Sequence, residues 1–91
     1  MEQEIQRSAE KEMARMKEVF AHIKVDDPKD KSARDFYDFA NNYFKDGQYF
    51  YKEKKFIESF EAFVISWAYI DIGLKLGIFS VPEDQEKWFT A

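Results

Sequence analysis

The chain has no cysteine, one histidine, two prolines and three glycines among its 91 residues. The lack of cysteine excludes a disulfide framework, thiolate catalysis and metal sites with thiolate ligands. It fits a reducing compartment, so we expect a cytoplasmic protein. The clearest break in the chain is the turn over residues 25–30, where Pro28 disfavours a helical conformation of Asp27.

No secretory signal is visible, because Glu2 and Glu4 stand where such a signal would carry basic residues. The longest apolar stretch, over residues 62–70, is too short to span a bilayer and ends at Asp71. The net charge is only −4 and both signs are interspersed, so no general field favours nucleic acid or an anionic membrane. We therefore expect no membrane partner and no nucleic-acid partner.

The chain also lacks a glycine-rich phosphate loop, a nucleophile motif, and carboxylates paired with histidine at metal-ligand spacing. We therefore predict no metal site, no cofactor and no catalytic residue, and the sequence favours a non-enzymatic protein. Two weaker patterns leave open a ribonuclease-like or nucleic-acid-binding alternative. Arg15 and His22 have a spacing found in HEPN-type helical ribonucleases, and the turn Lys52–Lys55 places lysines beside aromatic residues.

Aromatic residues are abundant: they make up 19% of the chain and include ten phenylalanines. Such large side chains allow a single small domain to bury a stable core. Within residues 56–79, FIESFEAFVISWAYIDIGLKLGIF, apolar residues recur at spacings of three and four and predict a central helix over residues 55–77, stopped by Gly77. Its main stripe, which we expect to face the preceding helix, consists of Phe56, Phe60, Phe63, Trp67, Ile70 and Leu74, widened by Ile57 and Val64.

The opposite side of the central helix begins polar, with Glu58 and Glu61, and continues apolar. Two packed helices do not reach its apolar part, which is too large to leave in water. We expect the C-terminal tail, through Trp88 and Phe89, to cover part of it, and another protein or a second copy of the chain to cover the rest. These features favour a non-enzymatic protein–protein interaction or scaffold module. The candidate partner-binding residues are Ile65, Tyr69, Ile72 and Leu76, with Tyr69 as the best anchor.

Asp71 is a charged residue on the otherwise apolar main stripe. A carboxylate in that position is costly unless it is paired or hydrogen-bonded. Lys75 follows four residues later, in the favourable order of acid before base. We predict that Asp71 is largely buried and held by Lys75 or another donor, either as a structural acid or as part of a ligand site.

Two further helices and a short C-terminal helical turn complete the predicted fold. Residues 2–24 form the first helix, and residues 32–53 form the second, opened by a capping box of Ser32 and Asp35. Gly47 lies in the apolar stripe of the second helix, where it should let the central helix approach closely. A tight turn near Glu53 or Lys54 reverses the chain, and residues 82–89 form the short helical turn. We thus predict one all-α domain, residues 1–91, folded as a three-helix antiparallel bundle.

The segment WAYIDIGLKLGIF at residues 67–79, after FKDG at 44–47 and EAF at 61–63, resembles a family of small archaeal proteins, domain-of-unknown-function family 357. The likeness covers roughly residues 33–82. It implies a small all-helical domain from an archaeal cytosol and no assigned activity, so no role comes with it to Asp71 or Gly77. The chain from Ala40 onwards also resembles, more loosely, one helix pair of the tetratricopeptide type. This likeness concerns only the geometry of the helix hairpin.

Overall fold

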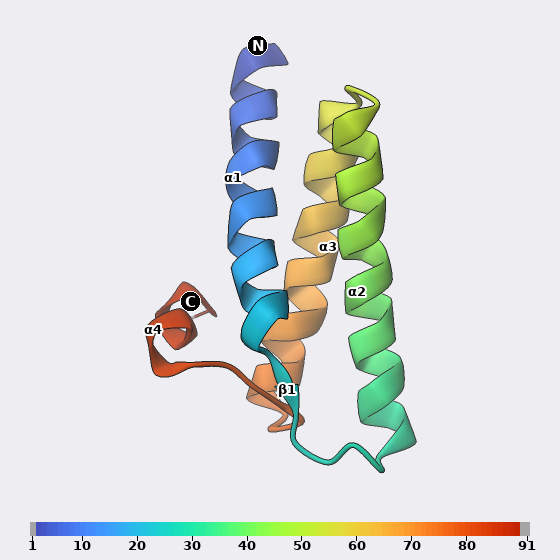
Figure 1. The fold of residues 1–91 in the computed structure, drawn as a ribbon, viewed down its shortest axis with the longest axis vertical. Coiled ribbons are helices and arrows are strands. Elements are labelled where there is room, and N and C mark those ends of the chain that lie inside the picture. Colours follow the sequence, from blue (N-terminus) through green and yellow to red (C-terminus); the bar gives the residue numbers. More distant parts are fainter. Residues whose placement is uncertain (1, 90–91) are drawn as a thin grey trace.

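Three long helices carry most of the chain in the computed structural model, which describes residues 2–89. Consecutive helices run in opposite directions (Figure 1), so the predicted all-α, three-helix antiparallel bundle is confirmed. Residues 1, 90 and 91 of the predicted domain lie outside the described part. The elements are α1 Glu2–His22, β1 Lys24–Val25, α2 Lys31–Lys52, α3 Phe56–Lys75, β2 Phe79–Ser80, α4 Glu83–Glu86 and the short 3₁₀ helix η1 Lys87–Phe89.

A short antiparallel strand pair, absent from the prediction, joins the segment after α1 to the segment after α3. Lys24 pairs with Ser80, and Val25 pairs with Phe79. Because the backbone of residues 24 and 25 bonds to β2, α1 ends at His22 instead of continuing to residue 24 as predicted. The strand pair also fixes the direction in which the tail leaves the bundle.

The interface between α2 and α3 is built on small residues. The Ser59 hydroxyl donates to the Gly47 carbonyl at 2.7 Å, and the Ser66 hydroxyl donates to the Ala40 carbonyl at 2.6 Å. All four residues are buried. On each helix the two residues are seven positions apart, close to two helical turns, so both bonds lie along one line of approach. The prediction that Gly47 lies against the central helix is confirmed.

The large residues of the main stripe do not all face α2. Some pack against α2, and others pack towards α1 and the C-terminal tail. Phe63 meets α2, where its ring lies over Gly47. Phe60 and Trp67 line a hollow with α1 and the tail, and the Trp67 ring stacks on Phe89 with centroids 4.1 Å apart. The prediction that this stripe faces α2 holds for Phe63 but is wrong for Phe60 and Trp67, because a full row of aromatic side chains would hold the two backbones apart.

Asp30, and not Ser32, caps the N-terminus of α2. Its side chain accepts hydrogen bonds from the backbone N–H groups of Ser32 at 2.9 Å and Ala33 at 3.3 Å. The predicted capping box of Ser32 and Asp35 is therefore wrong: Asp30 already occupies the cap position, and Asp35 pairs instead with Lys31 at 2.7 Å.

Both α2 and α3 end in a residue with left-handed backbone conformation. Gly77, at φ 76°, follows the end of α3 as predicted, and the Ile78 N–H donates to the Gly73 carbonyl at 3.0 Å. Lys54 takes the equivalent place after α2 at φ 62°, and the Lys55 N–H donates back into α2 at 2.8 Å. The tight turn predicted near Lys54 is thus present, but without a glycine.

Replacing Gly47 with leucine should lower the free energy of unfolding by about 1–3 kcal/mol, because even a Cβ atom there would lie 2.5 Å from the Phe63 ring. Asn42→Leu, at an exposed position of the same helix, should change stability by less than about 0.5 kcal/mol. Thermal or urea unfolding measures both. Equal midpoints for Gly47→Leu and wild type would contradict the close approach of α3.

Replacing Lys54 with glycine should stabilise the protein by about 0.5–1 kcal/mol. The substitution relieves a left-handed conformation that costs about 1–2 kcal/mol, against an entropic loss of about 0.4–1 kcal/mol. Lys52→Gly, in the last turn of α2, should instead destabilise by up to about 1 kcal/mol. Unfolding curves that rank these variants in the opposite order would show that the turn differs from this geometry.

Candidate interaction surface

Apolar side chains are exposed along the side of α3 that no other helix covers. Seven large apolar side chains in the described chain are exposed; four of them lie on α3 and a fifth, Leu76, directly follows its last residue. On the helical wheel these five, with Glu61, Ala68 and Lys75 between and beside them, share one side; we call this set the outer face of α3. Its apolar members are Ile57 at 58% exposure, Val64 at 47%, Ile65 at 40%, Ile72 at 46% and Leu76 at 66%.

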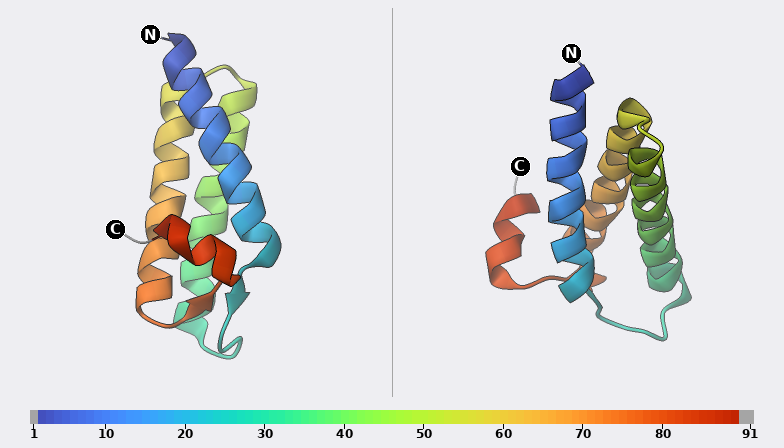
Figure 2. Two further views of the ribbon diagram at one scale, coloured as in Figure 1. Left: turned by 90° about the vertical axis from the view of Figure 1, so that its left-hand side faces the viewer. Right: turned by 45° about the horizontal axis from the view of Figure 1, so that its top comes forward.

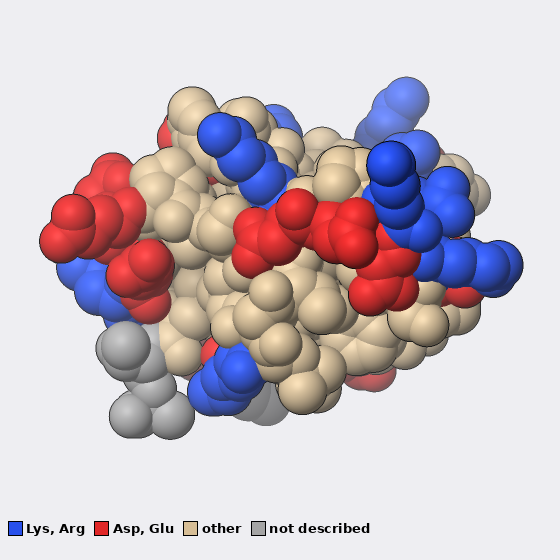
Figure 3. All heavy atoms as spheres, turned by 90° about the horizontal axis from the view of Figure 1, so that it is seen from below, with Lys and Arg blue, Asp and Glu red and all other residues tan. Residues whose placement is uncertain are grey.

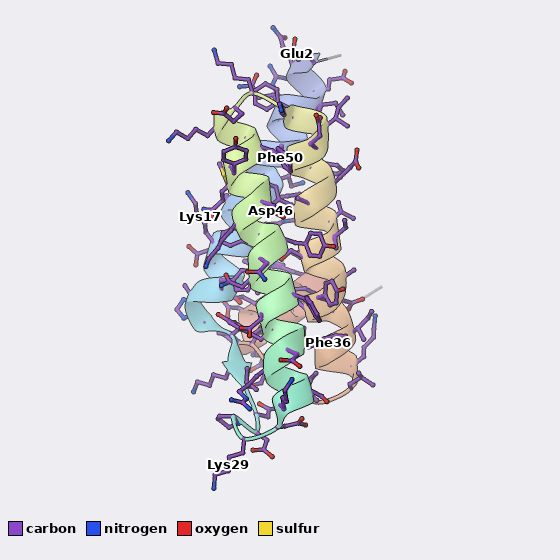
Figure 4. The ribbon with its side chains drawn as sticks, turned by 90° about the vertical axis from the view of Figure 1, so that its right-hand side faces the viewer. Glu2, Lys17, Lys29, Phe36, Asp46 and Phe50 are labelled. Atoms are coloured by element: carbon purple, nitrogen blue, oxygen red, sulfur yellow. The ribbon has the colours of Figure 1, made fainter. Side chains whose placement is uncertain are left out.

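The middle of this face points away from the two other long helices, and its borders adjoin them: Ile57 and Val64 line hollows shared with α1, and Ile65 lines one shared with α2. The left view of Figure 2 and Figure 4 show the bundle from opposite sides, and in both α3 forms an outer edge with α1 and α2 to one side of it. In the described part of the chain, Ile65, Ile72 and Leu76 keep 40–66% of their surface exposed. Ile57 and Val64, which the sequence assigned to the buried stripe, are exposed here instead, because they lie on its margin nearest the outer face.

Tyr69 differs from the other predicted partner-binding residues because it packs against α2. Its ring stacks on Tyr43 with centroids 5.9 Å apart and meets the Phe36 ring edge-on at 5.1 Å. Phe39, 51% exposed, lies beside Tyr69 at 5.7 Å. Tyr69 is therefore half-buried and joins the outer face of α3 to an aromatic patch on α2. Figure 4 shows Phe36 and Phe50 along the side of the bundle that α2 forms.

The tail does not cover the predicted strip. It turns back beside α1, so that α4 lies across the lower halves of α1 and α3 (Figure 2). Gln85, buried, donates through Nε2 to the Glu18 carbonyl of α1 at 3.2 Å, and Phe89 stacks on Trp67. The expectation that Trp88 and Phe89 cover part of the strip is wrong, because Trp67 offers them a stacking partner on the other side of α3.

Asp71 lies at the edge of the outer face, beside a hollow of about 440 Å³ between α3 and the tail. Its side chain is 27% exposed, and one carboxylate oxygen accepts from Lys75 Nζ at 2.8 Å. The other oxygen is buried and has no hydrogen-bond partner within residues 2–89. The predicted pair of Asp71 and Lys75 is therefore present, and one oxygen of the carboxylate is left unsatisfied.

The residues of the alternative functions do not form a site. Arg15 pairs with Glu12 at 3.5 Å, and His22 is exposed at the C-terminal end of α1. Lys52, Lys54 and Lys55 are exposed around the turn between α2 and α3. Among the described residues, no group of three or more His, Cys, Asp or Glu side chains is arranged to hold a metal ion.

The distribution of charge at one end of the bundle also gives no support to a nucleic-acid-binding site. Figure 3 shows the lower end of the bundle, where basic side chains gather at one edge beside a band of acidic ones, and further acidic side chains lie at the opposite edge across uncharged surface. That end offers no continuous basic surface to a phosphate backbone. No helix in residues 2–89 is both long enough and apolar enough to cross a bilayer.

The three long antiparallel helices define a small helical-bundle protein. The family described as "Protein of unknown function (DUF357)" matches residues 6–79, and the chain belongs to that family. Its fold is similar to the crystal structure of protein AF1782 from Archaeoglobus fulgidus, which carries the same family assignment: the TM-score is 0.76 at 27% identity, over 89% of this chain and 97% of that one. No curated protein matches. The resemblance to family 357 is confirmed, and AF1782 supports its archaeal association.

Replacing Asp71 with leucine should raise the free energy of unfolding by about 1 kcal/mol. An unsatisfied buried oxygen costs about 1–3 kcal/mol, whereas an ion pair with the 60% exposed Lys75 contributes at most about 0.5 kcal/mol. Lys75→Leu should have an effect below about 0.5 kcal/mol. Chemical denaturation of both variants tests this, and a loss of more than 1 kcal/mol in Asp71→Leu would show that the carboxylate is structurally required.

Proposed function

We propose that the protein is a non-enzymatic, cytoplasmic protein–protein interaction module that docks its partner on the outer face of α3. One observation carries the proposal: of the seven exposed large apolar side chains of the described chain, four lie on α3 and a fifth, Leu76, lies at its C-terminal cap. Scattered exposed apolar residues are ordinary on a protein surface, but a contiguous row is typical of an interaction site.

The row has the spacing that helix-mediated recognition uses. Ile65, Ile72 and Leu76 recur at seven and four positions, with Ala68 between the two isoleucines, so a partner helix can lie along them. Each of these side chains that leaves water contributes in proportion to its exposed area, at about 25 cal/mol per Å². The aromatic patch of Tyr69 and Phe39 adjoins the row and supplies rings of the type enriched at binding hot spots.

The stability of the fold does not explain this row. The core of the bundle is closed by residues on the other sides of α3, such as Phe63 and Ile70, both at 0% exposure. Polar residues at Ile65 and Ile72 would leave that core unchanged and would improve solubility. Their apolar character therefore indicates a requirement outside the folded monomer.

The double variant Ile65→Glu/Ile72→Glu tests the proposal. Its matched control is Ala14→Glu/Ala21→Glu, which places two glutamates at the same seven-residue spacing on exposed positions of α1. Wild type and control should associate, with themselves or with a protein retained from an extract of the native cells, and the α3 variant should lose that association. All three should unfold within a few degrees of one another.

Two measurements give the readout: analytical ultracentrifugation of the purified proteins and quantitative capture from the extract. Equal association of the α3 variant and the wild type would overturn the proposal. So would a wild type that stays monomeric, retains no protein and binds no hydrophobic dye.

A further inference from the structure

Resting on the interaction role proposed above, we infer that the occupant of the outer face is a second copy of this chain. The two α3 helices would lie antiparallel across a twofold axis near Ala68. The inference comes from the order of residues along the face. When one copy of the helix is reversed against the other, apolar residues meet apolar residues and acidic residues meet basic ones.

Ala68 stands at the centre of the face, exposed, with an isoleucine on either side. Ile65 precedes it by three positions and Ile72 follows it by four. Glu61 precedes it by seven positions and Lys75 follows it by seven. When the helix is turned end over end about Ala68, the isoleucines exchange places and the glutamate takes the place of the lysine. A twofold interface requires this property, because the same patch must serve both partners.

The charges at the two ends select the antiparallel arrangement. Glu61 is exposed and forms no ion pair with any residue in 2–89. Lys75 is 60% exposed and donates to Asp71, but an ammonium group has three donors and can reach a second carboxylate. In the antiparallel pair each Lys75 meets the Glu61 of the other copy. A parallel pair would instead bring like charges together at both ends.

The size of the side chains suits a close helix pair. An alanine at the crossing point lets two backbones approach, and the isoleucines on either side fill the space beyond it. A 20-residue helix is about 30 Å long. That length gives room for an apolar centre with one Glu61–Lys75 pair at each end. The exposed Phe39 and the ring of Tyr69 flank the face and widen the contact towards the area of about 800 Å² per partner that stable dimers bury.

A foreign partner would not need this symmetry. A face that recruits a basic or an acidic helix would carry one sign of charge along its border. Here the first half of the face carries Glu61, and the last turn carries Lys75. The tail, which could have occupied the face, packs on Trp67 instead. The outer face is therefore exposed in each monomer, and it is complementary to the same face of a second copy.

Two charge reversals test the geometry with the full chain. In Glu61→Lys, both reciprocal pairs become lysine against lysine, and in Lys75→Glu both become glutamate against glutamate. Each single variant should dimerise about tenfold more weakly than the wild type. An equimolar mixture of the two variants should form a heterodimer in which every pair is attractive, and the double variant Glu61→Lys/Lys75→Glu should again form a homodimer. Sedimentation equilibrium and native mass spectrometry measure these species.

A steric variant gives an independent reading. Ala68→Arg should abolish the dimer, and Ala14→Arg, at an exposed alanine of α1, should leave it intact. Single variants that dimerise like the wild type, or a mixture with no preference for the heterodimer, would overturn the antiparallel pairing. A wild type that is monomeric but retains another protein through Ile65 and Ile72 would overturn the dimer and leave the proposed function standing.

Discussion

The close approach of α2 and α3 is the constraint on which the rest of the molecule depends. Gly47 and Ala40 bring the α2 backbone near enough for two serine hydroxyls of α3 to reach its carbonyl oxygens. Each bond satisfies a buried hydroxyl that would otherwise be costly, and the two together fix how far one helix is shifted along the other. Because small residues form the closest contact, Phe60 and Trp67 are displaced to other sides of α3.

That displacement decides which side of α3 is free. With the small residues against α2, Phe60 and Trp67 line the space shared with α1 and the tail. A helix with two such neighbours has one side left, and in most small bundles that side is polar. Here it carries the row from Ile57 to Leu76, so the interaction surface follows from the way the core is packed. The half-buried Tyr69 connects the outer face of α3 to the aromatic patch on α2.

Much of the fold could be predicted because it depends on periodicity and on a few special residues. The recurrence of apolar residues located three helices to within about two residues, and the roles of Gly47 and Gly77 followed from the backbone freedom of glycine. Which side of α3 faces α2, and which side is exposed, could not be predicted in the same way. Its wheel is apolar on nearly every side, so nothing in the pattern shows that Ser59 and Ser66 make the closest contact with α2 while Phe60 and Trp67 face elsewhere. The same ambiguity hid the exposure of Ile57 and Val64, and the position of the tail depends on a long-range stack with Trp67.

The strand pair has a consequence for the order in which the molecule assembles. The α2–α3 hairpin is formed by neighbouring segments and closes a short loop, so it can form early. The pairing of Lys24 with Ser80 closes a loop that contains both of these helices and has a larger entropic cost. This strand pair is therefore expected to form late and to open first. Its opening would separate the segment after α1 from the start of the tail, while the hairpin, with the outer face of α3, remained folded.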